Sequence, residues 1–505
     1  MSHISHRERG NDLELEVDYV VVGSGAGGAA AAVTLARGGA KVAIVEAGAW
    51  RDPEDYPGSS YGAMRDLFDD WGSQLARGRA LWPIVQARTV GGTTVINSAI
   101  CVRTPGDIFE QWERERGVGG DAMAERVWAH QDTLERELSV EEVPKDARGH
   151  SNRLAMLGAK GAGYESHWIH RYVKDCDGAG QCLQGCRAGR KRSTNLNYVP
   201  EVLRLGGYVV SSAPVKRVLF EDQRAVGVQG RFQHPKTRRR GADFRVRARR
   251  AVVVAASATH SPALLQRSGV RSKALGEGFR AHPGTGVFGV YDEPVDTNTG
   301  ATQGWASTAF REDPGLKLET LSIPFEMVAS RLSGGGKNLI QRIREYRHIC
   351  MWVHAVRAES VGTVRNGFFD KPVVKYGLNK KDMLRFRRGM HLVAQTHVAA
   401  GAKKIIPGIQ GMPYELRPDQ VDLLLEAPLD PRRYIAILSH LFGGCTMGDD
   451  PATALTDGSG RVHGYTNLVV ADASVIPSNL GVNPQHTIMA LAMTFAEDLL
   501  DDAPA

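Results

Sequence analysis

The sequence feature that most constrains the fold is a glycine-rich run, Gly23-Ser-Gly25-Ala-Gly-Gly28, which directly follows an apolar stretch. Gly23 permits a tight turn, Gly25 lets the backbone approach a pyrophosphate, and Gly28 lets the next helix pack closely on the strand. A second apolar run, at positions 41–46, ends in Glu46, whose carboxylate would accept hydrogen bonds from ribose hydroxyls. The pattern predicts a dinucleotide-binding βαβ unit, in which the N-terminus of an alanine-rich helix faces the diphosphate.

The length and composition are typical of a large, loop-rich globular enzyme. A chain of 505 residues predicts two or three domains, and 57 glycines with 23 prolines indicate many loops. No apolar run reaches the roughly 18 residues that are needed to cross a bilayer. The N-terminal residues are polar and lack the apolar core of a signal peptide. We therefore expect a cytoplasmic protein without a membrane span.

The net charge of +7 comes partly from arginines at positions 236–250. A basic stretch of this kind could bind nucleic acid or an acidic partner. Here, however, the arginines alternate with Phe244, Val246 and Ala248, as on a strand with one solvated face. The alternation favours a surface hairpin, and we expect no nucleic-acid partner.

The spacing of apolar residues divides the chain into successive units. Helical spacing at 107–140 is followed by strand patterns at 208–257, which end in a continuous apolar run typical of a strand buried on both faces. Residues 285–430 read as a separate unit of strands and amphipathic helices. A buried-strand pattern returns at 467–472, and a helix is predicted at 487–500. A nucleotide-binding domain made from three separated pieces is the simplest interpretation.

Five further motifs extend in order over nearly the whole chain: Gly91–Asn97, Ala258–Gly269, Gly276–Pro283, His440–Gly448 and Asn483–Thr487. Together they resemble the motifs of the glucose–methanol–choline (GMC) family of flavin-dependent oxidoreductases. The resemblance implies an α/β fold, with a Rossmann-like FAD-binding domain built from discontinuous segments and a substrate domain with a mixed or antiparallel sheet and helices. The FAD domain would take 15–100, 201–284 and 436–505, a cap segment with a cysteine loop 101–200, and the substrate domain 285–435.

The resemblance also implies which residues bind FAD. Glu46 is expected at the adenosine ribose, Val215 at the adenine through its backbone, and Asp472 near the ribitol. The other expected cofactor-binding residues are Gly23, Gly25, Gly28, Gly91, Gly92, Thr93, Asn97, Ala258 and Pro484. Some relatives carry a histidine that attaches the flavin covalently at the position of Ile96, which has no nucleophile. We therefore expect non-covalent FAD.

Oxidation of an alcohol by hydride transfer to flavin N5 requires a base that removes the hydroxyl proton. A histidine suits this step because its ordinary pKa is about 6.5. By similarity, His440 is the expected base and Asn483 the group that holds the hydroxyl, a pair like that of cholesterol oxidases. Alternatives are a core role for His440 and a helix N-cap for Asn483. His486 lies three residues later and could face the substrate or only begin a helix.

Three cysteines, Cys176, Cys182 and Cys186, lie in a glycine-rich loop that continues into basic residues. Clustered thiolates suit a soft metal or an iron–sulfur cluster. The spacing resembles catalytic subunits of some membrane-linked sugar dehydrogenases, which hold a three-iron cluster there, and also the loop of long-chain alcohol oxidases, where no cluster is established. The alternatives are a reduced structural loop, which we favour, or one disulfide with a spare thiol.

The sequence therefore predicts FAD-dependent oxidation of an alcohol, on a bulky or apolar substrate, with oxygen or another electron acceptor. A second hypothesis is an iron–sulfur dehydrogenase subunit that passes electrons to a redox partner protein. A third is a non-redox lyase on the same scaffold, which keeps FAD without turning it over.

Overall fold

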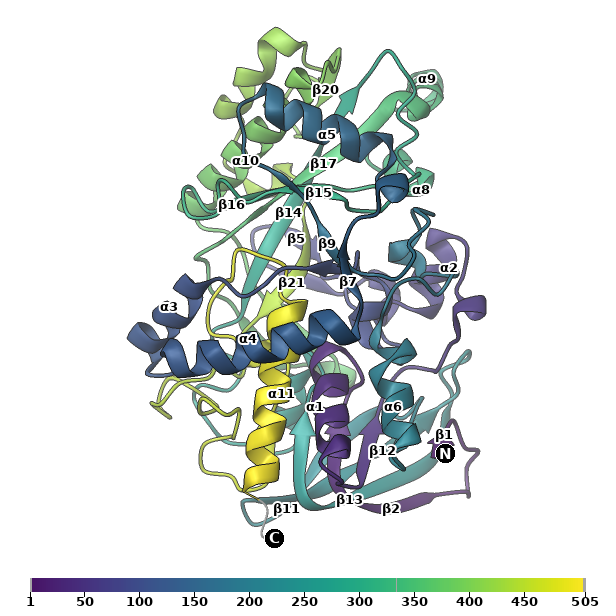
Figure 1. Cartoon of the computed structure of the whole chain (residues 1–505), viewed down its shortest axis with the longest axis vertical. Helices are drawn as coiled ribbons and strands as arrows, with labels where there is room; N and C mark the ends of the chain where they lie inside the picture. The colour runs from purple at the N-terminus through teal and green to yellow at the C-terminus, as the bar shows by residue number, and fades with distance from the viewer. Residues whose placement is uncertain (1, 333, 503–505) are drawn as a thin grey trace.

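The computed structural model describes residues 2–332 and 334–502, which form two bodies stacked along the long axis of the molecule (Figure 1). The lower body is built around a mostly parallel sheet and contains the glycine-rich run. The upper body is built around an antiparallel sheet covered by helices on its outer side. Each body has a hydrophobic core of its own, as expected for a chain of this length.

The lower sheet has its strands in the spatial order β1-β10-β3-β2-β13-β12-β11, and β22 pairs with the end of β13. Its strands are β1 (Ser2–Ile4), β2 (Leu13–Val22), β3 (Val42–Val45), β10 (Tyr208–Val210), β11 (Val215–Glu221), β12 (Arg224–Gln233), β13 (Arg240–Val254) and β22 (Leu468–Val470). Pairing is parallel except where β11 and β12 form a meander with the first half of β13. The sheet is thus assembled from three separated parts of the chain, as the sequence predicts.

The two halves of β13 show why the apolar pattern changes along it. In the first half, Arg245, Arg247 and Arg249 are exposed and alternate with buried residues, so that this half has one solvated face. In the second half all residues from 251 to 254 are buried, because parallel neighbours and helices cover both faces. The arginine-rich segment is therefore part of a surface meander, as its alternation predicts.

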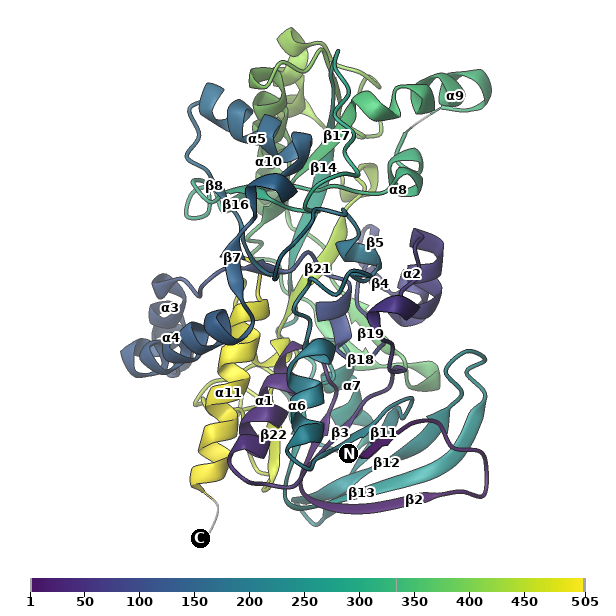
Figure 2. The ribbon, with the colours of Figure 1, turned by 45° about the vertical axis from the view of Figure 1, so that its right-hand side comes forward.

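Helices of the lower body cover the parallel part of the sheet, where α1 and α11 lie side by side (Figure 2). They are α1 (Ala26–Arg37), α6 (Tyr198–Arg204), α7 (His260–Arg267) and α11 (Gln485–Asp501), with α3 (Gly106–Arg116) and α4 (Gly120–Glu137) packed at the side. The helical pattern at 107–140 is divided between α3 and α4, because Gly117 adopts a left-handed conformation with φ of 70° and ends α3.

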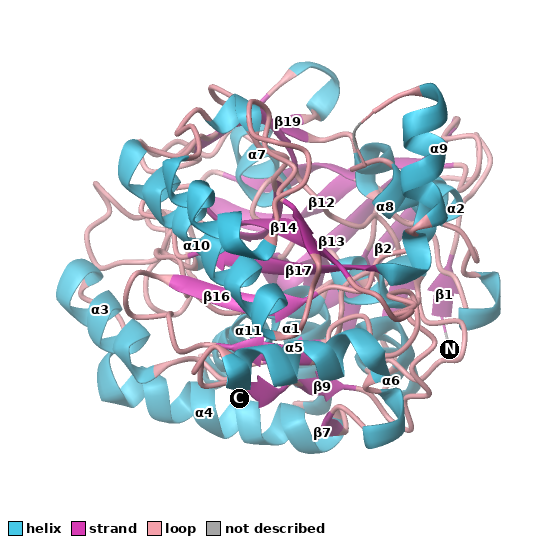
Figure 3. Cartoon of the chain, turned by 90° about the horizontal axis from the view of Figure 1, so that it is seen from above, coloured by secondary structure: helices cyan, strands magenta, loops and turns pink. Residues whose placement is uncertain are grey.

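The upper sheet has the order β20-β14-β17-β16-β15-β8, and β21 pairs with the first part of β14. Its strands are β8 (His167–Trp168), β14 (Arg280–Val290), β15 (Trp305–Ser307), β16 (Leu316–Thr320), β17 (Ile349–Val356), β20 (Lys404–Ile406) and β21 (Ile437–Phe442). All of these pairings are antiparallel. Viewed from above, α10 (Lys380–Ala399) lies over β14 and β17 (Figure 3), and α5 (Gly149–Gly161) packs beside it against β15 and β16.

Smaller elements surround the junction of the two bodies. One small sheet contains β18 (Thr363–Asn366), β19 (Pro372–Lys375), β4 (Leu75–Arg77) and β5 (Leu81–Pro83), and another contains β6 (Ile100–Cys101), β9 (His170–Tyr172) and β7 (Val140–Glu142). The remaining helices are α2 (Ser60–Asp66), α8 (Phe325–Ala329) and α9 (Gly336–Arg344). Within the described residues, no helix is long and apolar enough to cross a membrane. The division of the chain into five segments stays a prediction.

Candidate active site

A cavity of about 1580 Å³ lies where the carboxyl ends of the lower parallel strands meet the inner face of the upper sheet. This exceeds the roughly 300–1,000 Å³ of an ordinary small-molecule pocket, so there is room for a dinucleotide and a substrate together. The expected site residues that line the cavity are Gly23, Gly25, Glu46, Gly92, Thr93, Asn97, Val215, Ala258, His440, Asp472, Asn483 and Pro484. Gly28 and Gly91 do not line it.

The glycine turn after β2 has room only for backbone. Gly23 has φ of 103°, and a Cβ atom there would lie 2.3 Å from the carbonyl oxygen of Ala255. A Cβ at Gly28 would lie 2.2 Å from the carbonyl oxygen of Gly23, so its role is close packing behind the cavity. Gly25 is the N-cap of α1, and a Cβ atom added there would lie 3.9 Å from the Cα atom of Gly92. The unpaired N–H groups of the first turn of α1 are thus available to an anion.

Glu46 follows β3 and is buried. Its carboxylate accepts hydrogen bonds from the backbone N–H and the hydroxyl of Ser24, at 3.0 and 2.7 Å, and from the N–H of Gly48 at 2.7 Å. Burial raises the pKa of Glu46, and these three donors oppose the rise. The Ser24 hydroxyl also accepts from the N–H of Gly91 at 2.9 Å, which joins the two glycine loops. Ser24 was not singled out from the sequence, because a serine within a glycine run carries no distinctive signal.

Asp472 follows β22, at the same edge of the sheet. Its carboxylate accepts from the N–H of Ser474 at 2.7 Å, the N–H of Ser257 at 2.8 Å and the hydroxyl of Ser261 at 2.5 Å. The bonds join the 258–269 motif to a segment more than two hundred positions later in the chain. Asp472 therefore holds the loop at 257–261 and the loop at 472–474 in a fixed position relative to each other.

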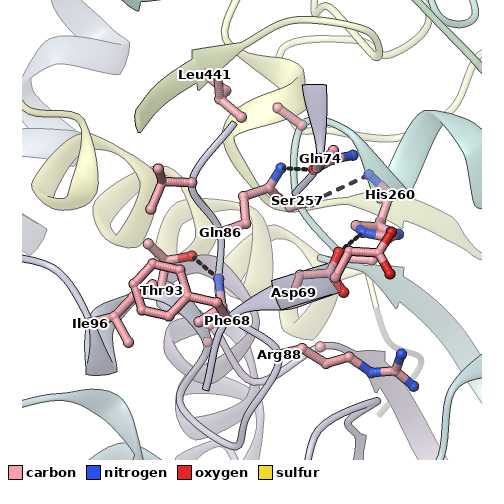
Figure 4. Close-up of a pocket in the computed structure, with 18 of the residues that line it drawn as sticks. Phe68, Asp69, Gln74, Gln86, Arg88, Thr93, Ile96, Ser257, His260 and Leu441 are labelled. Atoms are coloured by element: carbon pink, nitrogen blue, oxygen red, sulfur yellow. Dashed lines mark hydrogen bonds and ion pairs between the residues drawn. The ribbon is translucent and has the colours of Figure 1, made fainter. Parts of the chain in front are cut away.

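The loop after Gly91 forms another wall, seen in Figure 4 with Thr93 and Ile96 beside Phe68. Ile96 is buried and lines the cavity. Next to Phe68, a carboxylate oxygen of Asp69 lies 2.8 Å from His260 Nε2 (Figure 4). Burial of Asp69 opposes its ionisation, but the neighbouring His260 outweighs this and lowers the pKa of Asp69 to about 2. No sequence pattern predicts that these two residues pair, because they lie 191 positions apart in the chain.

The upper sheet brings the two expected catalytic residues together. His440 on β21 pairs with His282 on β14, and their Nδ1 atoms lie 3.1 Å apart. Asn483, directly before α11, places its Nδ2 3.3 Å from His440 Nε2. Because an amide NH₂ group only donates, His440 Nε2 accepts this hydrogen bond. His440 therefore has an unprotonated nitrogen that faces Asn483.

The surroundings of His440 favour its neutral form. Burial is the main cause and lowers its pKa to about 4, while Glu319 opposes this shift and Lys317 adds to it. A histidine that is neutral at ordinary pH can accept a proton. The core interpretation of His440 is therefore incomplete, because this partly buried residue also lines the cavity.

Asn483 does not cap α11 with its side chain. The N-cap position is Pro484, without a side-chain cap bond, and the Asn483 Oδ1 accepts from the ammonium of Lys317 instead. His486 points away from the cavity, with its Nδ1 2.6 Å from the hydroxyl of Tyr172 and its Nε2 3.3 Å from Glu135. Of the two alternatives for His486, the structure therefore favours a residue at the start of the helix, since the start of α11 turns its side chain toward β9 and α4.

Lys317 was missed as a site residue, and for Glu319 the sequence favours a core or surface role over one in the substrate pocket. They alternate with apolar residues in Leu316–Thr320, a pattern that ordinarily indicates one solvated strand face. All of β16 is buried instead, and Glu319 lines the cavity. Only the pairing of β16 with β15 and β17 brings these charges beside His440.

The cysteine loop contains a buried cation next to its sulfur atoms. Arg171 on β9 donates to Cys182 Sγ at 3.1 Å and to Cys176 Sγ at 3.6 Å. Burial alone would raise the pKa of Cys182, but Arg171 and Lys191 together lower it below its ordinary value. All six cysteines of the chain, which lie within the described residues, are free. The Arg171 guanidinium occupies the space next to the sulfur atoms that a cluster would need. The arrangement therefore does not support an iron–sulfur cluster.

The loop has a structural connection to the cavity. The Lys191 ammonium is buried and donates to the backbone oxygens of Val95, Asn97 and Cys182, at 2.5, 2.8 and 2.9 Å. Burial lowers the pKa of Lys191 to about 8. The cysteine loop thus supports the cavity-lining segment 91–97 from behind.

Comparison with known proteins agrees with this arrangement. The N-terminal and C-terminal sequence profiles described as GMC oxidoreductase match residues 17–284 and 358–492. An uncharacterized GMC-type oxidoreductase of Mycobacterium tuberculosis is 34% identical over 486 residues, which cover 95% of this chain and 75% of that protein. A long-chain-alcohol oxidase of Arabidopsis thaliana is 26% identical, over 96% of this chain and 67% of its own length.

A solved structure shows the same fold. Pyridoxine 4-oxidase from Mesorbium loti superposes with a TM-score of 0.71 at 17% sequence identity, covering 95% of this chain and 98% of that one. The two family profiles together span well over half of the sequence and include both the glycine turn and the His440 segment. The chain therefore belongs to the GMC oxidoreductase family and is an FAD-dependent flavoprotein oxidoreductase.

Proposed function

We propose that this chain oxidises an alcohol to a carbonyl compound, with His440 as the general base and Asn483 as the group that holds the hydroxyl. The observation that carries the proposal is the contact between His440 Nε2 and Asn483 Nδ2 in the wall of the large cavity. FAD, when bound, supplies the ring that accepts the hydride. The long-chain-alcohol oxidase among the relatives supports an alcohol as the substrate.

The residues at the strand ends fit FAD. The glycine turn at Gly23 and Gly25 leaves backbone facing the cavity, and the N-terminus of α1 suits a diphosphate. Glu46 and Asp472 each place a buried carboxylate in the cavity wall, where we propose contacts to the ribose and the ribitol. Val215 would meet the adenine through its backbone. Because Ile96 has no nucleophile, we propose that FAD is held without a covalent bond.

The protein's part of the reaction is a proton transfer. We propose that the substrate hydroxyl binds against His440 Nε2 and Asn483 Nδ2, with the amide donating to its oxygen. The hydroxyl proton passes to Nε2 while the carbon releases a hydride, so the alcohol loses two electrons and two hydrogens and becomes a carbonyl. An amide that donates to the oxygen favours the alkoxide character that develops during this step.

The inner wall of the cavity supports a bulky or apolar substrate. Gly284 and Gly286 lie on β14 in the cavity wall, where the side chain of Met351 packs closely against Gly286. Apolar side chains continue the wall beyond them: Leu321, Met327, Met351 and Val353. We propose a long or bulky alcohol for this reason, with molecular oxygen as the acceptor because the named relatives are oxidases. A cytoplasmic location remains part of the proposal, to be tested by cell fractionation.

The test is anaerobic mixing of the holoenzyme with a series of primary alcohols of increasing chain length. Loss of flavin absorbance is expected, fastest with long chains, and admission of air should restore the absorbance with formation of hydrogen peroxide. Acid precipitation should release the FAD into the supernatant. If flavin remains oxidised with every alcohol, the proposal fails and the lyase hypothesis gains. Reduction without reoxidation by air would instead indicate a dehydrogenase.

A further inference from the structure

Beside His440 and Asn483 lies a buried ion pair formed by Lys317 and Glu319. Lys317 and Glu319 lie two residues apart on β16, on one face of the strand, with side chains that are 1% and 6% exposed. The Lys317 ammonium lies 2.7 Å from a carboxylate oxygen of Glu319. Gln303 donates to the other oxygen at 3.3 Å. Burying a charge costs free energy unless the charge is paired. Each member of the pair therefore offsets the desolvation cost of the other.

The Lys317 ammonium also contacts the expected substrate-holding residue. It donates a hydrogen bond to the Asn483 Oδ1. An ammonium has no acceptor, so it selects the oxygen end of the amide and directs the NH₂ end of Asn483 toward His440 Nε2. The orientation of an amide is set by its hydrogen-bond network, and here Lys317 decides it.

We propose that Lys317 is a positioning residue for the oxidation, which holds Asn483 with its NH₂ group toward the substrate oxygen. The inference rests on the proposed function. Without this contact, Asn483 could rotate and present its oxygen, which cannot donate to a developing alkoxide. Lys317 thus acts through Asn483 and does not touch the substrate itself.

Glu319 limits the electrostatic effect of this lysine on the base. The groups that face His440 are His282 from β14, Lys317 and Glu319 from β16, and Asn483 before α11. Lys317 lowers the pKa of His440 and Glu319 raises it, in addition to the larger effect of burial. Removing one member of the pair therefore leaves the pKa of His440 shifted by the other member alone. Removing both members removes two opposite shifts, so the pKa of His440 should change little.

The experiment compares three variants of the holoenzyme: Lys317→Met, Glu319→Gln and the double variant. The rate of flavin reduction by an alcohol is measured against pH. Lys317→Met should lower the limiting rate on the order of 10²-fold, as for a misplaced catalytic group, and shift the acidic limb of the profile to higher pH. Glu319→Gln should shift that limb to lower pH. The double variant should restore the position of the limb but not the rate.

A second readout does not depend on turnover. Nitrogen chemical shifts of His440, assigned by comparison with His440→Ala, report which ring nitrogen carries the proton. In the wild type we expect the proton on Nδ1, because Nε2 accepts from Asn483. Lys317→Met should abolish this preference. If no alcohol reduces the wild type, the proposed function fails, while the tautomer of His440 still tests Lys317.

Two results would overturn the inference. One is a double variant that recovers the full rate, since Lys317 would then serve only to neutralise Glu319. The other is an unchanged His440 tautomer in Lys317→Met. If Lys317→Met does not fold, Lys317→Gln keeps a similar length and a donor NH₂ group. It should retain more of the rate than Met while shifting the acidic limb in the same direction, and a rate equal to that of the wild type would show that the charge itself has no role.

Discussion

The dinucleotide side and the substrate side of the cavity differ in how their polar groups are gathered. On the dinucleotide side, Gly23, Ser24, Gly25 and Glu46 lie within one βαβ unit, in which Ser24 donates hydrogen bonds directly to Glu46. On the substrate side, the groups come from β14, β16, β21 and the start of α11, and hydrogen-bonded partners lie up to 166 positions apart. Local geometry is enough for the first, whereas the second exists only when the upper sheet has formed.

The two sides of the cavity also differ in the interactions that stabilise them. The glycine turn is held by backbone sterics, so a single added carbon causes a clash. The substrate wall is held by hydrogen bonds between buried charged and polar side chains, where loss of one partner leaves the other unsatisfied. We therefore expect changes on the first side to act on cofactor content and changes on the second to act on rate.

The largest expected effect is that of Gly23→Ala. Its Cβ would lie 2.3 Å from the carbonyl oxygen of Ala255, and the φ of 103° is strained for alanine. The turn must move, and we expect protein without bound FAD, measured by the flavin absorbance per chain after purification. Gly39→Ala is the matched control, because Gly39 also has positive φ, +81°, but no atom within 4 Å of the added carbon. The control should keep FAD at a cost of about 1–2 kcal/mol in stability.

His440→Ala should come next and act on rate alone. Loss of a general base typically costs 10²- to 10⁴-fold, so flavin reduction should slow by about this factor while FAD content is unchanged. His397→Asn is the control, because His397 is a buried histidine that contacts Tyr291 and Val287 and does not line the cavity. Equal slowing in both variants would contradict a specific role for His440.

The pH dependence of the wild type tests the same residue. Burial lowers the pKa of His440 to about 4, and the base must be unprotonated to act. The reduction rate should therefore be constant above about pH 5 and fall as the pH drops through 4. An acidic limb near pH 6.5 would mean that His440 is not desolvated in the working enzyme.

Glu46→Gln should have a moderate effect confined to the dinucleotide side. The amide keeps the size of the side chain but loses the charged acceptor, and hydrogen bonds to charged groups contribute about 1.5–3 kcal/mol. We expect FAD to dissociate roughly 10- to 100-fold more readily, measured by fluorescence of released flavin. The reduction rate at saturating FAD should not change. A change in rate with normal FAD affinity would break the distinction between the two sides.

The smallest effect is expected for the cysteine loop. Anaerobically purified protein should contain flavin but no stoichiometric iron or acid-labile sulfide, and Cys182→Ala should leave the flavin spectrum unchanged. Because buried Arg171 loses an acceptor, stability should fall by about 1–3 kcal/mol. Cys350→Ala, a buried thiol not contacted by this cation, serves as the control. About three irons per flavin would restore the cluster hypothesis.

Much of the lower body could be predicted from local patterns. The glycine turn, the buried strand at 251–254 and the helix at the C-terminal end each carry a short-range signal, and the structure has β2, β13 and α11 at these places. The arginine alternation likewise identified a strand with a solvated face. These signals work because strand and helix periodicity depends on residues only a few positions apart.

The remaining site residues carried misleading signals. Lys317 and Glu319 alternate with apolar residues like an exposed strand, although β16 is buried. His486 shares a motif with Asn483, but successive side chains at a helix start point in different directions. The cysteine spacing suggested a metal, because the sequence could not show that Arg171 from β9 lies between two of the sulfurs.

The sequence by itself thus determined the family, the FAD-binding βαβ unit and the two residues, His440 and Asn483, that face each other in the cavity wall. Only the tertiary structure decided which charges surround them, which way the Asn483 amide faces and what fills the cysteine loop. The physical reason is the distance along the chain between the residues that interact. Backbone conformation follows from neighbouring residues, whereas the stability of a buried charge depends on partners that strand pairing brings from distant parts of the chain.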